Sequence, residues 1–264
     1  MPTQRPAEIG HEALWRERLT KGRPPRRVTR RVFRLLPSPP RCKLCHNPFG
    51  GIGGKIAGLI GFTPSRKNPN LCNRRCDRLP PGGAEIDIAI LFADVRGSTA
   101  MAERSQLSEY AQVINRFYRV ATETLVRHDA IIDKLIGDEV MALFIPGFCG
   151  PEYHRRSVEA AYALLRGMGY GASTRPWLRI RGAVYSGVAY VGNVGGEGIV
   201  DFTALGDPIN TASRLQGEAA EGQILLGDAV YASVRERFPD LKILSLPLRG
   251  KDEFVTVRVL DARD

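Results

Sequence analysis

The 264-residue sequence contains no apolar run that could cross a membrane, which takes about 18 or more residues with few charges. Near the N-terminus it also lacks an apolar stretch followed by a small-residue cleavage site, so no secretory signal is predicted. From these two absences we expect a cytoplasmic protein. The apolar share of 43% is ordinary for a globular protein and predicts a packed core.

Acidic residues are scarce in the first third of the sequence. Residues 1–80 carry 18 Lys and Arg against 4 Asp and Glu, whereas the rest of the chain carries 20 Lys and Arg against 24 Asp and Glu. This asymmetry indicates two parts with different roles. Residues 1–41 show no sustained apolar periodicity and contain a Pro-Ser-Pro-Pro stretch, so we expect a flexible basic arm. Such an arm could contact nucleic acid, anionic lipid or an acidic partner, or be a solvated tail.

Cysteine is rare, with five residues in the chain, and four of them fall within residues 42–80. They form the pairs Cys42-x-x-Cys45 and Cys72-x-x-x-Cys76. Two close pairs with a spacer are typical of a four-thiolate metal site. A segment this short buries little apolar surface, so a bound metal would supply stability. We predict a zinc module, with an iron–sulfur cluster or a redox-active dithiol as alternatives. The glycine-rich spacer predicts tight turns.

Residues 84–264 are predicted to form an α+β domain without internal repeats. Apolar runs bounded by turn residues predict strands at 86–92, 131–135, 140–145, 178–185, 188–191, 224–226 and 255–260. Apolar residues at helical spacing predict helices at 101–128, 155–167 and 208–216. The order strand, helix, strand, strand, helix, strand is that of a ferredoxin-like βαββαβ fold.

Two aspartates stand at predicted strand ends. Asp94 follows a buried strand and precedes a loop rich in Gly, Ser and Thr, and Asp138 lies beside a glycine in a predicted hairpin turn. Carboxylates at strand ends can converge on one Mg²⁺, which binds through a few carboxylates and substrate phosphates. The loop 95–99 leads into a helix, so its backbone N–H groups could cradle phosphate oxygens. Singly, each aspartate also fits a simple turn or cap.

Three segments together resemble the class III adenylate/guanylate cyclase catalytic domain, in the order and spacing of that family. They are Phe92-Ala-Asp-Val-Arg-Gly-Ser-Thr99, Asp133-Lys-Leu-Ile-Gly-Asp-Glu-Val-Met-Ala142 and Asp201-Phe-Thr-Ala-Leu-Gly-Asp-Pro-Ile-Asn-Thr-Ala-Ser-Arg-Leu215. Shorter stretches at 191–195 and 248–251 also fit. The resemblance spans roughly residues 85–262 and does not cover residues 1–80.

The resemblance implies a role for each matching position. Asp94 and Asp138 would hold two Mg²⁺ or Mn²⁺ ions, which can stabilise the attacking and leaving oxygens of an in-line displacement. The remaining roles concern the nucleotide: Lys134 and Thr203 for the base, Asn210 for the ribose, Arg214 for transition-state charge, and Arg249 or Lys251 for the triphosphate. The family also implies a head-to-tail homodimer whose two subunits share each site.

The hydrogen-bonding groups at the base position favour adenine. Lys134 can only donate, which suits adenine N1, and the Thr203 hydroxyl can accept from the N6 amine. Guanine presents the reverse pattern and would leave groups unpaired. The predicted activity is therefore conversion of ATP to cyclic AMP and pyrophosphate. A guanylate cyclase, or an inactive cyclase-like domain that binds a nucleotide or a partner, is the alternative.

Overall fold

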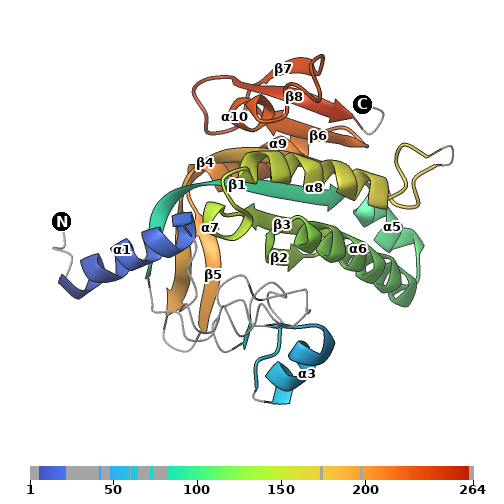
Figure 1. Cartoon of the computed structure of the whole chain (residues 1–264). Helices are drawn as coiled ribbons and strands as arrows, with labels where there is room; N and C mark the ends of the chain where they lie inside the picture. The colour runs from blue at the N-terminus through green and yellow to red at the C-terminus, as the bar shows by residue number, and fades with distance from the viewer. Residues whose placement is uncertain are drawn as a thin grey trace.

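The structure is a computed structural model that describes residues 6–21, 42, 48–59, 61–64, 72–73, 82–172, 175–196 and 199–261. A single mixed sheet with helices on its two faces forms the main body (Figure 1). Its strands are β1 Gly82–Val95, β2 Ile131–Ile136, β3 Glu139–Phe144, β4 Ile180–Gly196, β5 Ile199–Leu205, β6 Gln223–Gly227, β7 Lys242–Leu246 and β8 Val255–Asp261. Its helices are α1 Pro6–Lys21, α3 Gly51–Leu59, α5 Ser98–Arg104, α6 Leu107–Arg127, α7 Pro146–Cys149, α8 Tyr153–Gly167, α9 Asp207–Glu218 and α10 Asp228–Ala232.

The strand order confirms the predicted α+β fold. It runs β2-β3-β1-β4-β6-β8-β7, with β5 paired to β4 outside this path. The first four strands with the helices between them give the ferredoxin-like βαββαβ arrangement, in which β1 pairs antiparallel with both β3 and β4. The predicted hairpin forms from β2 and β3 around residues 137–138. The C-terminal strands β6, β7 and β8 extend the sheet at the top of Figure 1.

Alternation along β1 divides the core into two layers. Leu91 and Ala93 point to the side covered by α6 and α8, where Phe117 and Leu164 are fully buried. The alternate residues point to the other side, in one cluster with Trp15 of α1. Because both faces of β1 are covered, residues 88–93 are buried without interruption. Asp94 shares the α1 side of the sheet, since it is two residues beyond Phe92.

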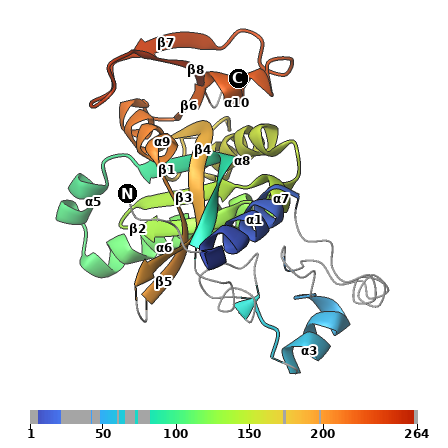
Figure 2. The same ribbon diagram turned by 90° about the vertical axis from the view of Figure 1, so that its left-hand side faces the viewer.

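Helix α1 differs from the flexible arm that we predicted for residues 1–41. Residues 6–21 are helical, and the helix packs against β1 and α7 (Figure 2). Trp15 is 1% exposed and stacks on Phe202 of β5, with ring centroids 6.1 Å apart, and Leu19 is fully buried. The helix is polar and is anchored by these two side chains, so its apolar residues do not recur regularly enough to predict a helix from the sequence. Residues 22–41 lie outside the described part, so the rest of the arm stays a prediction.

Helix α3 corrects a second expectation, because the glycine-rich spacer between the cysteine pairs was predicted to form turns. Residues 51–59 are helical instead. Glycine serves close packing here: a Cβ on Gly54 would lie 2.4 Å from the backbone oxygen of Phe49. Gly54 therefore lets the helix approach the backbone just before it, which composition alone does not reveal.

Strand β4 is continuous through Gly187, where we predicted a turn between two strands. The glycine marks close packing instead, because a Cβ at this position would lie 2.8 Å from Cγ of Pro208 in α9. The predicted helix at 101–128 is also interrupted. Ser105 adopts an extended backbone, and Gln106 then caps α6 through a reciprocal capping box with Glu109. Strands β5 and β7 and helix α10 were not predicted.

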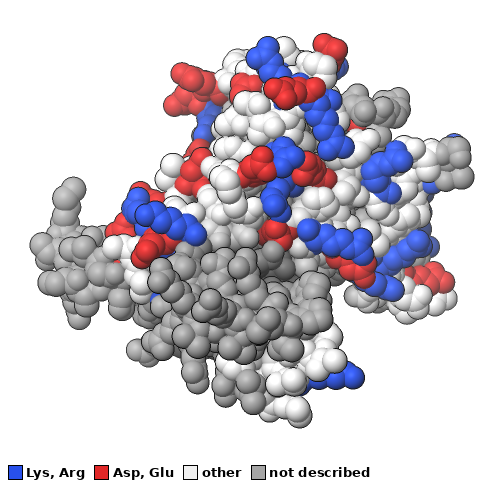
Figure 3. Space-filling model, viewed as in Figure 1, with Lys and Arg blue, Asp and Glu red and all other residues white. Residues whose placement is uncertain are grey.

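Charges of both signs are interspersed on the face shown in Figure 3. This distribution agrees with the near balance of acidic and basic residues after position 80. Among the described residues, no helix has the length and apolar character needed to cross a membrane.

Candidate functional site

The two predicted metal-binding aspartates lie at one end of the sheet. Asp94 is next to last in β1, and Asp138 lies in the turn between β2 and β3. The backbone N–H of Val95 donates to the carbonyl oxygen of Asp138 at 3.2 Å, which joins this turn to the end of β1. From α6, the Tyr118 hydroxyl donates to the carbonyl oxygen of Gly137 at 2.7 Å and holds the turn from the other side. The structure thus brings the two aspartates together as predicted.

Glu139 adds a third carboxylate to this end of the sheet. It is directly opposite Asp94 in the β1–β3 register, so both side chains lie on the same face. Burial, followed by the charges of Asp94 and Asp138, raises the pKa of Glu139. Like charges held this close favour either protonation or a bound cation.

Asp94 is held by two residues that sequence reasoning missed, and both contact the same oxygen. Arg181 donates to Oδ2 from Nε at 3.2 Å and from Nη2 at 3.0 Å, and Gln216 of α9 donates to it from Nε2 at 2.6 Å. Arg181 is opposite Asp94 in the β1–β4 register. No spacing in the sequence signals either contact, since both depend on which strands and helices become neighbours.

The other oxygen of Asp94 fits a metal ion. Oδ1 is buried and has no hydrogen-bond partner among the described residues. Burial raises the pKa of Asp94, the hydrogen bonds from Arg181 and Gln216 lower it, and the charge of Asp138 raises it again; the net pKa is above its ordinary value. A divalent cation would satisfy Oδ1 and offset the repulsion from Asp138, and oxygen ligands are those that Mg²⁺ prefers. Asp94 and Asp138 are therefore suited to hold it.

The residues predicted to contact the ribose and to stabilise the transition state both lie on α9. Asn210 and Arg214 are one turn apart, so they share a face of the helix, and both are exposed. Gln216, which contacts Asp94, is two residues from Arg214 and so about 200° around the helix. Within one chain, α9 thus presents its buried face to Asp94 and the face with Arg214 elsewhere. No hydrogen bond or ion pair between described residues joins Asn210 or Arg214 to either aspartate.

The predicted triphosphate residues lie in a loop beside α9. Lys251 forms an ion pair with Asp207 in the first turn of α9. Gly250 lies against the Arg214 guanidinium, since a Cβ there would be 3.3 Å from Nη1, and its φ of 76° favours glycine. Arg249 is exposed in the same loop. The loop therefore brings Arg249 and Lys251 to the neighbourhood of Arg214, where Lys251 is paired with Asp207 within the chain.

The predicted base-reading pair meets at a third residue, Asp133. Thr203 is opposite Gly192 in the β4–β5 register, and its hydroxyl donates to Asp133 Oδ2 at 3.0 Å. Lys134 Nζ lies 3.9 Å from the same oxygen. The structure thus brings Lys134 and Thr203 to one place through a carboxylate whose role the sequence analysis did not single out.

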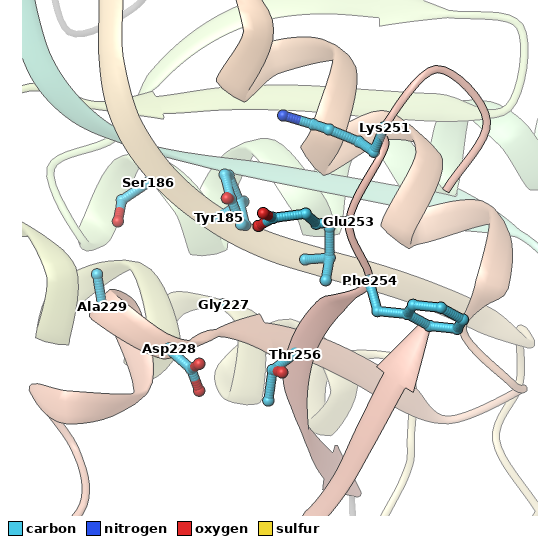
Figure 4. Close-up of a pocket in the computed structure, with 10 residues that line it drawn as sticks. Tyr185, Ser186, Gly227, Asp228, Ala229, Lys251, Glu253, Phe254 and Thr256 are labelled. Atoms are coloured by element: carbon cyan, nitrogen blue, oxygen red, sulfur yellow. The ribbon is translucent and has the colours of Figure 1, made fainter. Parts of the chain in front are cut away.

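A cavity of about 390 Å³ lies between β4, β6, α10 and the loop before β8 (Figure 4). Its lining mixes the carboxylates of Asp228 and Glu253 with the hydroxyls of Ser186 and Thr256. Of the predicted site residues, only Lys251 contributes to it. This cavity is therefore distinct from the place where the structure gathers the other predicted site residues.

The cysteines are described only in part. Cys42 and Cys72, one from each pair, are buried side by side, and the backbone N–H of Cys72 donates to Cys42 Sγ at 3.2 Å. Cys45 and Cys76 lie outside the described residues. Within the described part of the chain, no group of three or more His, Cys, Asp or Glu is arranged to hold a metal.

The fold and the paired aspartates define a nucleotidyl cyclase domain. Residues 84–260 match the family described as the Adenylate and Guanylate cyclase catalytic domain, and the chain belongs to this family. It is 29% identical over 208 residues to an adenylate cyclase of Anabaena cylindrica, over 74% of this chain and 41% of that protein. The chain therefore spans less than half the length of this curated relative.

The fold is also similar to solved cyclase structures. The adenylyl cyclase CyaB from P. aeruginosa matches with a TM-score of 0.60 and 24% identity, over 68% of this chain and 96% of that one. The guanylyl cyclase Cya2 matches with a TM-score of 0.60 and 24% identity, over 67% and 93%. Because enzymes of both base preferences share the fold, the fold does not select the base.

The buried Oδ1 of Asp94, which has no hydrogen-bond partner among the described residues, leads to a prediction about metal binding. Excess Mn²⁺ should raise the melting temperature of the wild type, since a ligand at 100 times its Kd adds about 2.7 kcal/mol of stability. Asp94→Asn should abolish this shift, because the amide is neutral and offers one fewer oxygen. Asp228→Asn, which changes an exposed carboxylate paired with Arg258, should retain it. Differential scanning fluorimetry measures the three shifts, and an undiminished shift in Asp94→Asn would contradict the assignment.

Proposed function

We propose that this protein is an adenylate cyclase that converts ATP to cyclic AMP and pyrophosphate in the cytoplasm. One observation carries the choice of base: Lys134 and Thr203 meet at Asp133, and the Thr203 hydroxyl gives its hydrogen to that carboxylate. Lys134 then offers a donor for adenine N1, and Thr203 offers an acceptor for the N6 amine. Guanine would instead place its N1–H donor against the Lys134 ammonium group and its O6 acceptor against a lone pair of the Thr203 hydroxyl.

The reaction needs the ribose 3′-hydroxyl to attack the α-phosphorus while pyrophosphate leaves. Two Mg²⁺ or Mn²⁺ ions held by Asp94 and Asp138 would stabilise the attacking and leaving oxygens. Asn210 would orient the ribose through its amide, which can both donate and accept. Arg214 would donate to the α-phosphoryl oxygens as negative charge builds there, because its guanidinium is always charged and its donors are fixed in a plane.

The placement of α9 supports a site shared by two chains. The helix turns Gln216 toward Asp94 of its own chain, so Arg214 faces away from that aspartate. A second copy, arranged head to tail, would bring its Arg214 and Asn210 to the metal-binding aspartates of the first. Apolar side chains beside the base-reading residues are exposed and would be covered by that copy: Leu135, Ile136 and Leu205. Two composite sites per homodimer follow from such an arrangement.

The base preference is tested by measuring cyclic nucleotide formation from ATP and from GTP by the purified protein, in Mg²⁺ and in Mn²⁺. We expect cyclic AMP from the wild type and no product from Asp94→Ala. Lys134→Glu should cut kcat/KM for ATP by about tenfold or more, because a carboxylate cannot donate to N1. Comparable turnover of ATP and GTP by the wild type would indicate a different base preference, and preferred GTP turnover would indicate a guanylate cyclase. No product under any of these conditions would favour a binding domain.

The shared site is tested by complementation. Arg214→Ala should lower turnover by about 10² or more, as for loss of one electrostatic stabiliser, whereas Arg235→Ala at an exposed position should not. An equal mixture of Asp94→Ala and Arg214→Ala chains should recover about a quarter of wild-type activity, since half of the randomly formed dimers carry one intact site. If subunit exchange is demonstrated and no activity returns, the shared site is wrong.

We further propose that the four N-terminal cysteines bind a metal, with zinc as the first choice and an iron–sulfur cluster as the alternative. The adjacency of Cys42 and Cys72 supports this, since one thiol from each pair must approach in a four-thiolate site. An N–H group that donates to a thiolate is also a common way to support a metal-bound sulfur. Metal analysis of the purified protein should find one zinc per chain, or iron with sulfide, and Cys42→Ser should lose it, whereas Cys149→Ser should not. Folded, metal-free wild type would refute the proposal.

A further inference from the structure

Asp133 lies at an irregularity in the sheet that changes where its side chain points. The β2–β3 register shifts between Ile132 and Lys134, so Asp133 sits in a β-bulge. In a regular strand, neighbours 133 and 134 would point to opposite faces. Bulges re-aim side chains, and here Lys134 Nζ lies 3.9 Å from Asp133 Oδ2. The bulge therefore lets a carboxylate stand beside the lysine on the base-reading side.

The carboxylate is fully buried and depends on few partners. The Asp133 side chain is 0% exposed, its Oδ2 accepts the Thr203 hydroxyl at 3.0 Å, and its Oδ1 has no hydrogen-bond partner among the described residues. Thr203 is itself buried, at 4% exposure. A buried charge with so few partners strongly favours keeping the hydrogen bond that it has.

A threonine hydroxyl can donate or accept, so by itself it does not distinguish an amine from a carbonyl. Its single hydrogen is already given to Asp133, and only lone pairs are left for a base. We propose that Asp133 is a specificity-determining positioning residue, which fixes the Thr203 hydroxyl as an acceptor and thereby makes the site select a 6-amino over a 6-oxo purine nucleotide. The inference rests on the proposed adenylate cyclase activity and assigns its base selectivity to a residue that need not touch the base.

Rejection of a 6-oxo purine follows from the cost of reversing this bond. For Thr203 to donate to a carbonyl oxygen, it must abandon Asp133 and leave a buried carboxylate oxygen unpaired. Leaving a buried polar group unsatisfied costs about 1–3 kcal/mol, and more for a charge. The same oxygen faces Lys134, so one carboxylate orders both base-reading groups.

The groups around Asp133 set its pKa, and so the pH range in which it holds the Thr203 hydroxyl as an acceptor. Burial raises the pKa of Asp133 from 3.8 to about 6, the Thr203 hydrogen bond and the Lys134 charge lower it, and Asp201 of β5 raises it. At a pH well above about 6 the carboxylate is ionised and Thr203 must donate. Below it, a protonated Asp133 can donate to Thr203, which frees the Thr203 hydrogen for a carbonyl oxygen. Selectivity is therefore expected to weaken as the pH falls through about 6.

The experiment compares kcat/KM for ATP and for inosine triphosphate, which differ only at the 6-substituent and the adjoining N1. Their ratio cancels effects on the metals, the ribose and the triphosphate. Asp133→Asn keeps the shape of the side chain, but its amide can also donate, so Thr203 is no longer obliged to donate. We expect the ratio to fall about tenfold in Asp133→Asn. Asp201→Asn, which removes a nearby carboxylate that is not bonded to Thr203, should leave the ratio within about twofold.

A double mutant separates this role from a structural one. Thr203→Val removes the acceptor, so adding Asp133→Asn to it should change the ratio no further. In the wild type the ratio should decline between pH 7.5 and 5.5, whereas in Asp133→Asn it should be flat. A wild type that does not prefer ATP would refute the proposed function itself. A wild type that prefers ATP, with an unchanged ratio in Asp133→Asn and no pH trend, would overturn the role of Asp133 alone.

Discussion

The long antiparallel pairing of β1 with β4 is the constraint on which the rest of the site depends. It runs from Gly82 opposite Asn193 to Val95 opposite Ile180 without a shift in register. At one end it sets Arg181 beside Asp94. At the other, Gly83 and Gly192 pass so closely that a Cβ on either would lie 2.4 Å or less from partner backbone atoms, so no side chain fits there. A one-residue slip would turn Asp94 toward the helices α6 and α8.

Strand β4 also positions Thr203, one of the two residues predicted to read the base. Beyond β1 it pairs with β5, which puts Thr203 opposite Gly192. One strand therefore fixes both the arginine that holds Asp94 and the threonine that meets Asp133. Helix α9 is seated on the same strand, where Pro208 packs against Gly187. The buried and exposed faces of α9 are then set by β4 as well, with Gln216 turned inward and Arg214 outward.

Much of the catalytic domain could be predicted because its signals are local. Asp94, Lys134 and Asp138 each lie in a short segment whose neighbours predict a strand end or a hairpin, and the structure has those elements. Arg181, Gln216 and Asp133 could not be assigned a role, since their contacts span 87, 122 and 70 residues. The turn predicted at Gly187 was wrong, because the sequence alone does not distinguish a glycine that makes room for a packed proline from one that forms a turn. Helix α1 was missed because Trp15 and Leu19 are buried by elements distant in the sequence, among them β1, β5 and α7.

Asp94, which is partly buried, and Asp133, which is fully buried, show how the neighbours of a carboxylate determine what its charge can do. Burial raises the pKa of both Asp94 and Asp133, and each keeps one oxygen without a hydrogen-bond partner among the described residues. Asp94 lies near the carboxylates of Asp138 and Glu139 and has Arg181 on one oxygen, so its other oxygen is suited to a cation. Asp133 stands between a lysine and a hydroxyl, so its charge is used to orient donors. The same type of side chain is thus proposed for cation binding at one site and for base selection at the other, and the strand register that sets its neighbours makes the difference.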